Sequence, residues 1–255
     1  MHFSQKKFNQ DGYCVFDLNK NLVLNIKKKI LNLISSVISE KYNIKKITEK
    51  QIIDLYNLKY KTDIISVFDH VGFFPELYSF ANQKQIIEIA NKVGLKFPVV
   101  GHSSKEGRGK VPFLYSFPND QKRNFKEHQD IFYLRYSMNA VTLWVPLQNT
   151  TKKNGALKVI PKSHKSYEIF NHSSVKSVKK NKLDKYFAES DFKSINVKLG
   201  QALIFSSYLV HKSGSNNSNQ IRMSFNVRFN DLLNKEYIKR GLSFDKLPDT
   251  KIKNL

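Results

Sequence analysis

Seven short runs rich in β-forming residues follow Leu95, and they restrict this chain to a fold built on sheets. Clusters of Gly, Asn, Ser and Lys separate the runs, as an antiparallel sandwich or barrel requires. The charged interval 165–193 interrupts the pattern, and we interpret it as an excursion over the sheet, either a lid or an idle surface loop. The predicted strands span residues 97–100, 111–117, 140–147, 156–160, 194–197, 202–210 and 221–229.

The first 95 residues have a different character and are predicted to be mainly helical. A turn at Asp11 and Gly12 leads into a short apolar strand over 13–16. Thr48 and Gln51 have the spacing of a capping box, which predicts that a helix begins there. Residues 63–80 are apolar and aromatic, and they are expected to form a short helix and a turn.

Two further helices follow from the spacing of apolar residues in this region. Residues 22–38 are predicted to form an amphipathic helix. Its inward stripe is expected to be Ile26, Ile30, Leu33, Ile34 and Val37. Asn82 is expected to cap another helix, which runs through Val93 and stops at Gly94.

The length of 255 residues suits one large domain with a substantial core. We assign residues 1–95 to helical support, 96–231 to the β core and 232–255 to a C-terminal tail. No segment reaches the roughly 18 uninterrupted apolar residues of a membrane helix, and the start lacks the apolar region of a secretion signal. The single cysteine, Cys14, cannot form an internal disulfide, so a cytoplasmic location is expected.

The formal charge of +22 is compatible with a polyanionic partner such as nucleic acid or a membrane surface. Lysine is abundant beside asparagine and isoleucine throughout, however, which indicates a compositional bias. Specific nucleic-acid readers favour arginine for its bidentate fork, and arginine is scarce here. Nucleic acid is therefore not the expected partner, and the arginines are the informative basic residues. They are Arg108, Arg123, Arg135, Arg222, Arg228 and Arg240.

Two pairs of polar residues carry the chemistry that the sequence suggests. His128 and Asp130 lie two residues apart, so in an extended segment both side chains project from one face and can close on one ion. A buried histidine beside a capping aspartate is the alternative from this motif alone. The second pair is His211, which follows the run 202–210, and Arg222. A hairpin around the loop 213–219 would bring Arg222 close to His211.

The return strand of that hairpin alternates between apolar and polar residues. Its polar face consists of Arg222, Ser224, Asn226 and Arg228. Such a face is usually exposed to solvent. Two arginines in a chain that otherwise uses lysine favour instead a face that holds a carboxylate.

Two histidines and one carboxylate on one face of a metal leave three open positions, which is the geometry of non-haem Fe(II) oxygenases. With neutral imidazoles and an ionised Asp130, the ferrous site keeps a net positive charge and favours an anionic chelator such as a 2-oxo acid. The far carboxylate of that co-substrate needs a fixed bidentate cation, which arginine supplies better than lysine.

Together these motifs resemble the phytanoyl-CoA dioxygenase-like (PhyH-type) family of Fe(II)/2-oxoglutarate oxygenases. The resemblance rests on FNQDGYCVFDL near the start, HQD at 128–130, LWVPLQNTTKKNGALKVIPKSHK at 143–165, and GQALIFSSYLVHKSG followed by IRMSFNVRF. The iron ligands that it implies are His128, Asp130 and His211. It also implies that Arg222 binds the far carboxylate of 2-oxoglutarate, and that Ser213 and Trp144 line the co-substrate pocket.

The resemblance further implies a mainly β, α+β architecture: a double-stranded β-helix, or cupin-like jelly roll, with the N-terminal helices packed along one sheet. The implied cofactor is Fe(II), with 2-oxoglutarate and O2 as co-substrates. The expected reaction is hydroxylation of an unactivated C–H bond of a small metabolite, with release of succinate and CO2. Relatives that halogenate replace the carboxylate at Asp130 with a small residue, so its presence favours hydroxylation. A non-redox metal-binding jelly roll, such as a cupin-like isomerase, and an inactive basic binding protein are the alternatives.

Several residues have more than one interpretation. Lys162 stands where the family often has glycine, so that turn is expected to differ locally. His164 is predicted to be a structural hydrogen-bonding histidine. Arg228, Asn226 and Arg135 are candidates for substrate contact, with surface roles equally open. The basic loop 105–110 gives weak evidence for phosphate binding. A cationic surface would suit a CoA-linked, nucleotide-linked or other phosphorylated substrate, although compositional bias explains the charge equally well.

Overall fold

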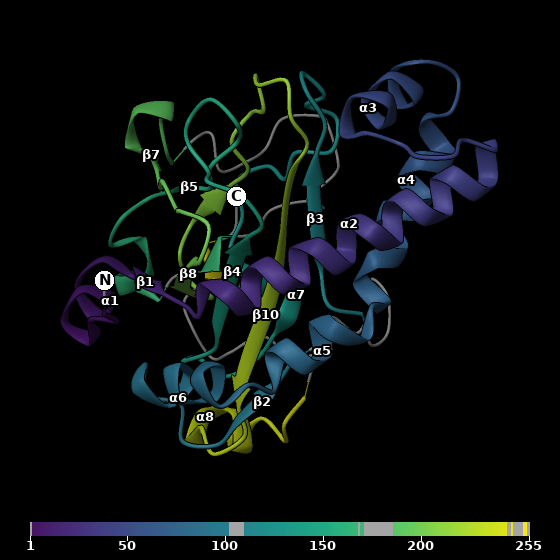
Figure 1. Ribbon diagram of the computed structural model, residues 1–255. Coiled ribbons are helices and arrows are strands. Elements are labelled where there is room, and N and C mark those ends of the chain that lie inside the picture. The colour runs from purple at the N-terminus through teal and green to yellow at the C-terminus, as the bar shows by residue number, and fades with distance from the viewer. Residues whose placement is uncertain are drawn as a thin grey trace.

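A computed structural model gives the structure of residues 2–101, 110–167, 169–170, 186–243, 246 and 252–253. Its centre is an antiparallel sheet with the order β1-β8-β4-β10-β2, in which β3 also pairs with β10 (Figure 1). The strands are β1 (Tyr13–Asp17), β2 (Pro98–Val100), β3 (Phe113–Ser116), β4 (Val141–Pro146), β8 (Gln201–Ser206) and β10 (Arg222–Asp231).

A smaller sheet faces this one and closes the sandwich. It has the order β7-β5-β9, with β5 (Lys158–Val159), β7 (Lys193–Ser194) and β9 (His211–Lys212). Isolated bridges extend it at Thr150 with Val197 and at Asn154 with Asn216. Buried apolar residues fill the space between the sheets, with Trp144 and Phe205 from the large sheet and Val159 from the small one. A short parallel pair, β6 (Ile169–Phe170) and β11 (Ile252–Lys253), and the 3-10 turns Ser163–Ser166 and Glu189–Asp191 complete this side.

The N-terminal helices cover the other face of the large sheet, and α2 crosses it diagonally (Figure 1). The helices are α1 (Gln5–Asp11), α2 (Lys20–Tyr42), α3 (Glu49–Asn57), α4 (Lys61–His70), the 3-10 turn η1 (Val71–Phe73), α5 (Pro75–Ala81) and α6 (Lys84–Lys92). Their apolar side chains form one core with the outward-facing residues of the sheet, such as Val145 and Phe225. The predicted α+β class with helical support for a sheet-rich core is confirmed. No helix among the described residues is both long and apolar enough to cross a membrane.

Local signals in the helical region were mostly reliable. The capping box at Thr48 and Gln51 is present, and Gly12 and Gly94 both adopt positive φ at helix ends. In α2 the inward stripe is Val23, Ile26, Ile30, Ile34 and Ile38. The prediction for Val37 was wrong, since this side chain is 42% exposed, and Leu33 is only half-buried. The stripe advances by three or four residues per turn, so Ile38 occupies the place assigned to Val37.

The predicted cap at Asn82 was also wrong. Its side-chain amide donates to the carbonyl of Tyr78 at the end of α5, and α6 begins after Gln83 without a side-chain cap. The last carbonyls of a helix lack partners within the helix, so an amide donor placed there satisfies one of them.

The predicted hairpin between residues 202–210 and 221–229 does not exist, because β4 lies between β8 and β10. Strand β8 ends at Ser206, whose carbonyl accepts from the Leu209 amide and whose hydroxyl accepts from Tyr208. The chain then leaves the large sheet and enters the small one at His211. The apolar run to Val210 is therefore a buried corner rather than a continuous strand.

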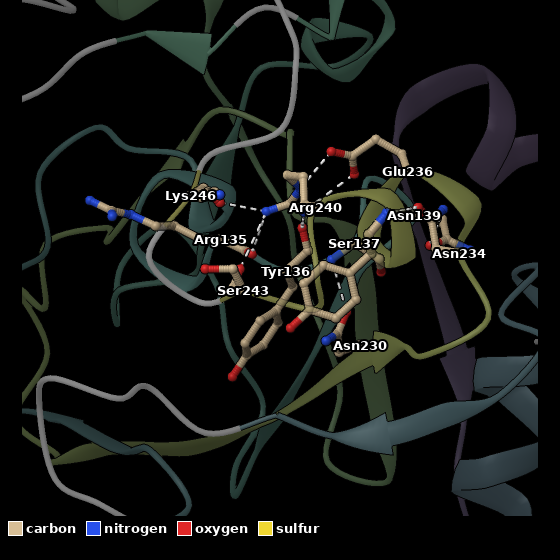
Figure 2. A network of polar contacts seen from close by, with 11 residues as sticks. Arg135, Tyr136, Ser137, Asn139, Asn230, Asn234, Glu236, Arg240, Ser243 and Lys246 are labelled. Atoms are coloured by element: carbon tan, nitrogen blue, oxygen red, sulfur yellow. Dashed lines mark hydrogen bonds and ion pairs between the residues drawn. The ribbon is translucent and has the colours of Figure 1, made fainter.

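The C-terminal part of the described chain is anchored by a buried arginine (Figure 2). Helix α8 (Lys235–Lys239) follows β10, and Arg240 at its end forms an ion pair with Glu236. The same guanidinium donates to the carbonyls of Arg135 (3.2 Å) and Tyr136 (2.7 Å). These residues follow α7 (Asp130–Leu134), so Arg240 ties the C-terminal helix to the segment that leads from α7 to β4.

We expect Arg240→Met to lower the free energy of unfolding by about 3 kcal/mol or more. Removing one partner of a buried ion pair leaves the other charge uncompensated, and here it also removes the donor to the carbonyls of Arg135, Tyr136, Ser243 and Lys246. Urea denaturation followed by circular dichroism measures this. Lys239→Met, an exposed neighbour on the same helix with the same loss of charge, serves as the control and is expected to change stability by less than about 0.5 kcal/mol. Equal effects of the two changes would contradict the role of Arg240.

The helical layer is held to the loop after β3 by Asp120. Its carboxylate accepts from Lys61 at 2.6 Å and from the Tyr56 hydroxyl. Burial alone would raise the pKa of Asp120, but these hydrogen bonds lower it from 3.8 to about 2.

A carboxyl whose pKa is lower in the folded state stabilises the protein above its unfolded pKa, and this contribution is lost as the pH falls from about 4 to 2. Asp120→Asn is therefore expected to remove about 2 kcal/mol at neutral pH and to flatten the acid limb of the stability curve in that range. Urea midpoints between pH 2 and pH 7 measure the effect. Exposed Asp54→Asn on α3 is expected to leave the acid limb unchanged.

Candidate active site

His128 and His211 are brought together by a direct backbone pairing. Each amide donates to the carbonyl of the other residue at 3.0 Å, which makes an isolated antiparallel bridge between segments far apart in the chain. Residues directly opposite each other in such a pair project from the same face. The two imidazole rings accordingly lie with their centroids 4.1 Å apart, and both are buried.

Asp130 reaches the same point from the chain that follows His128. Gln129 is extended, with φ −120° and ψ 132°, and Asp130 is the first residue of α7. Its Oδ1 atom lies 3.8 Å from Nε2 of His128. One ligand atom each from His128, Asp130 and His211 lies within 4.8 Å of the others. The predicted convergence of these three side chains is present, and we retain their role as metal ligands as a proposal.

Both imidazoles are oriented by backbone carbonyls two residues earlier. Nδ1 of His128 lies 2.7 Å from the Lys126 carbonyl, and Nδ1 of His211 lies 2.9 Å from the Leu209 carbonyl. A carbonyl only accepts, so each Nδ1 carries a proton and each neutral ring keeps its lone pair on Nε2. Metal-binding histidines are commonly oriented in this way.

The carboxylate of Asp130 is ionised although it is buried. Burial alone would raise its pKa, but the Arg228 guanidinium, the two imidazoles in their protonated form at low pH and the Thr142 hydroxyl lower the pKa to about 2. That hydroxyl donates to Oδ2 at 2.5 Å. Burial also lowers the pKa of His211, which keeps that imidazole neutral. An ionised carboxylate with neutral imidazole nitrogen is a donor set that suits a divalent transition metal.

An ion pair supports the histidine pair from the opposite face. Glu127 and Lys212 flank the two histidines, and Lys212 Nζ lies 2.9 Å from Glu127 Oε1. Lys212 Nζ also forms an ion pair with Glu189 Oε2 at 2.6 Å. The sequence shows an acidic and a basic residue beside the histidines, but only the pairing register reveals that they meet. We interpret Glu127 and Lys212 as positioning residues for the histidine-bearing segments.

Arg222 is a buried cation without an anionic partner among the described residues. Its Nη1 donates to the Ser224 hydroxyl at 3.1 Å, and the indole of Trp144 donates to the same oxygen at 2.9 Å. The Nε atom has no partner in the described part of the chain. Burial lowers the pKa of Arg222 to about 10, so the group is still charged at neutral pH. A buried unpaired guanidinium is costly, and a bound carboxylate would satisfy it.

Two glycines shape the space beside Arg222. Gly155 has φ +83°, and a Cβ there would lie 3.0 Å from the Gly214 carbonyl and 3.6 Å from Arg222 Nε. A Cβ on Gly214 would collide with the Ala156 carbonyl. The Ser213 hydroxyl accepts from the Phe125 amide at 3.1 Å and so holds the segment before His128. The predicted contacts of Ser213 and Trp144 with a co-substrate stay predictions.

The structure decides between the alternatives for other residues. Asn226 is buried and Arg228 is half-buried, and both face the interior, so the surface alternative was wrong for them. Lys162 adopts φ 70°, the conformation that glycine accepts most readily, and the expected local difference of this turn from the family stays a prediction. His164 lies 3.3 Å from the Asn9 carbonyl and against Gly12, as a structural histidine does.

Two sequence features fall outside the described residues. The basic loop 105–110 does so except for Lys110, and most of the excursion 165–193 does so as well.

Residues 99–224 match the family model for phytanoyl-CoA dioxygenase (PhyH), which confirms the predicted resemblance. The match contains the three candidate ligands and Arg222. No curated protein matches the chain by sequence.

Solved structures with this fold include non-haem iron enzymes. The apo form of the non-haem monooxygenase ThoJ has a TM-score of 0.61 at 14% identity, over 89% of this chain and 76% of that chain. EctD from S. alaskensis with 2-oxoglutarate and 5-hydroxyectoine has a TM-score of 0.58 at 18% identity, over 90% and 76%. EctD with bound Fe gives 0.58 at 17% identity, over 98% and 80%. These similarities confirm the predicted jelly-roll fold.

Removal of one candidate ligand should weaken metal binding strongly. We expect His211→Ala and Asp130→Ala to lower the affinity for Co²⁺ by more than the roughly 10- to 100-fold that loss of an outer-shell partner costs. Lys212→Met removes only a positioning contact, so its loss of Co²⁺ affinity should lie within that range. Competition with a coloured chelator measures each affinity. His70→Gln, on exposed α4 surface, is the matched control, and equal affinity of His211→Ala and His70→Gln would contradict the assignment.

Proposed function

We propose that this chain, a 2-oxoglutarate-dependent non-haem iron oxygenase of the phytanoyl-CoA dioxygenase (PhyH) type, hydroxylates an unactivated C–H bond of a small metabolite. Oxidative decarboxylation of 2-oxoglutarate would release succinate and CO2. The observation that carries the proposal is the pairing of a three-residue ligand cluster with Arg222, a buried guanidinium that has no anion among the described residues. The two features together fit a metal-chelating dicarboxylate.

In this proposal each residue has a defined task. His128, Asp130 and His211 hold Fe(II) and leave three positions open for the co-substrate and O2. Arg222 binds the far carboxylate, while the hydroxyl of Ser224 fixes the guanidinium and the indole of Trp144. Bound iron supplies the activation of O2, and the protein supplies orientation and exclusion of water.

The third ligand bears on the outcome of the reaction. The Asp130 carboxylate is held by the Thr142 hydroxyl and is ionised, so it is well placed to remain on the metal throughout. A relative that halogenates needs that position for a halide. The carboxylate at this position therefore favours hydroxylation.

The remaining assignments follow from the same proposal. We treat the whole chain as one catalytic domain that acts in the cytoplasm. Its partner is a small molecule, and the interior ligand set gives no role to nucleic acid.

The test is the consumption of 2-oxoglutarate. Purified protein with Fe(II), ascorbate and O2 is expected to form succinate slowly without substrate, and Arg222→Lys is expected to raise the KM for 2-oxoglutarate at least about tenfold, because lysine cannot form the bidentate pair. Arg123→Lys is the matched control, because Arg123 pairs with Asp69 away from this cluster.

Two results would contradict the proposal. If the protein binds metal but forms no succinate, and Arg222→Ala leaves metal binding unchanged, it is a non-redox metal protein. If the affinity for a polyanion falls steeply with salt concentration and does not change when the candidate metal ligands are substituted, the protein is a basic binding protein.

A further inference from the structure

The inner face of β10 carries two arginines, and the co-substrate explains only one of them. Arg222, Ser224, Asn226 and Arg228 alternate along this face. At about 3.3 Å per residue, the Cα atoms of Arg222 and Arg228 lie about 20 Å apart. This separation assigns the two guanidinium groups to different anions. Arg222 takes the far carboxylate of 2-oxoglutarate, which leaves Arg228 to be explained.

Arg228 is poorly satisfied by the described protein. Its Nη2 lies 3.6 Å from Oδ1 of Asp130, beyond hydrogen-bond distance, and its side chain is 16% exposed. Its Nε is buried without a hydrogen-bond partner, and so is Oδ1 of Asn226 on the same face. In the register of the sheet Arg228 lies opposite Thr142, and Asn226 lies opposite Trp144. These unpaired groups therefore lie within the site.

Arg228 and a metal would share the carboxylate of Asp130. Thr142 donates to Oδ2 of Asp130, so Oδ1 has more lone-pair capacity for a metal. This same Oδ1 lies 3.8 Å from Nε2 of His128 and 3.6 Å from Arg228. A ferrous ion at Oδ1 would share the carboxylate that, among the described residues, is the acidic group paired with Arg228. The guanidinium would then be partly buried beside a second cation.

The charges within the site lead to the same conclusion. A doubly negative 2-oxoglutarate and the Asp130 carboxylate offset the ferrous ion and Arg222, and one positive charge, that of Arg228, remains. A partly buried charge without a counter-ion is unfavourable. A second anion would remove this imbalance.

We infer that the substrate carries an oxyanion group, a carboxylate or a phosphate, and that Arg228 binds it beside the metal, with the Asn226 carbonyl accepting from a neighbouring donor. This inference rests on the proposed function and narrows its substrate class. Arg228 and Asn226 would thus be specificity-determining residues, separate from the residues that bind 2-oxoglutarate.

Ligand-observed NMR on the protein loaded with Zn²⁺ and saturated with 2-oxoglutarate tests the inference without turnover. The probes are butyrate, butyl phosphate and the neutral isostere butyramide. We expect wild type to bind at least one anion about tenfold or more tightly than butyramide, and Arg228→Met to lose that preference, as loss of a charge-assisted bond predicts. Arg228→Lys should retain part of it. The better-bound anion distinguishes a carboxylate from a phosphate site.

The control is Lys198→Gln, which removes one exposed positive charge outside the site and should keep the preference. Equal binding of all three probes by wild type would overturn the inference, whether or not Arg228→Met folds. Unchanged anion binding in folded Arg228→Met would also overturn it, because the anion would then be on the metal. Reduced Co²⁺ affinity in Arg228→Met with an unchanged anion preference would show that Arg228 only positions Asp130.

Failure of the proposed function gives a different result. Wild type would then show no binding of 2-oxoglutarate to the metal-loaded protein, measured in the same NMR experiment before any probe is added.

Discussion

The antiparallel bridge between His128 and His211 is the contact on which the site depends. Its two hydrogen bonds join the segment before α7 to β9, and they place two imidazoles on one face without a long strand on either side. Carbonyls of Lys126 and Leu209 then orient the rings, so backbone groups fix the tautomer of both imidazoles. The Glu127–Lys212 ion pair lies on the other face of the same bridge. Loss of this register would therefore move all three candidate ligands at once.

Strand β10 needs both of its faces buried, and this explains the helical half of the chain. Its outward residues, such as Phe225 and Val227, pack into the core formed with the N-terminal helices. Its inward face can then hold Arg222 and Arg228, whose burial would otherwise be unfavourable. The apolar packing on one side of the strand stabilises a polar face on the other. The N-terminal helices thus contribute to the site without supplying any of its candidate ligands.

The sequence predicted the elements well where the signal is local, as in the capping box at Thr48 and the alternation of β10. It also predicted that His128, Asp130 and His211 would meet. It failed on the neighbours of β8, because strand order depends on pairing between distant segments, and nothing near Val210 reveals that β4 intervenes. The contact of Arg228 with Asp130 was missed for the same reason. Its one available signal was its position six residues after Arg222 on the polar face.

Lysine and arginine occupy different environments in this protein. Most of the +22 charge comes from lysine, and lysines such as Lys198 and Lys239 are exposed, where a flexible hydrated ammonium suffices. Three of the six arginines instead occupy places that suit a fixed planar fork. Arg240 donates to four backbone carbonyls, and Arg222 and Arg228 face the interior of the sandwich. In a chain so biased towards lysine, these three arginines stand where geometry, rather than charge alone, is required. The proposed binding roles therefore rest on the interior arginines and not on the surface charge.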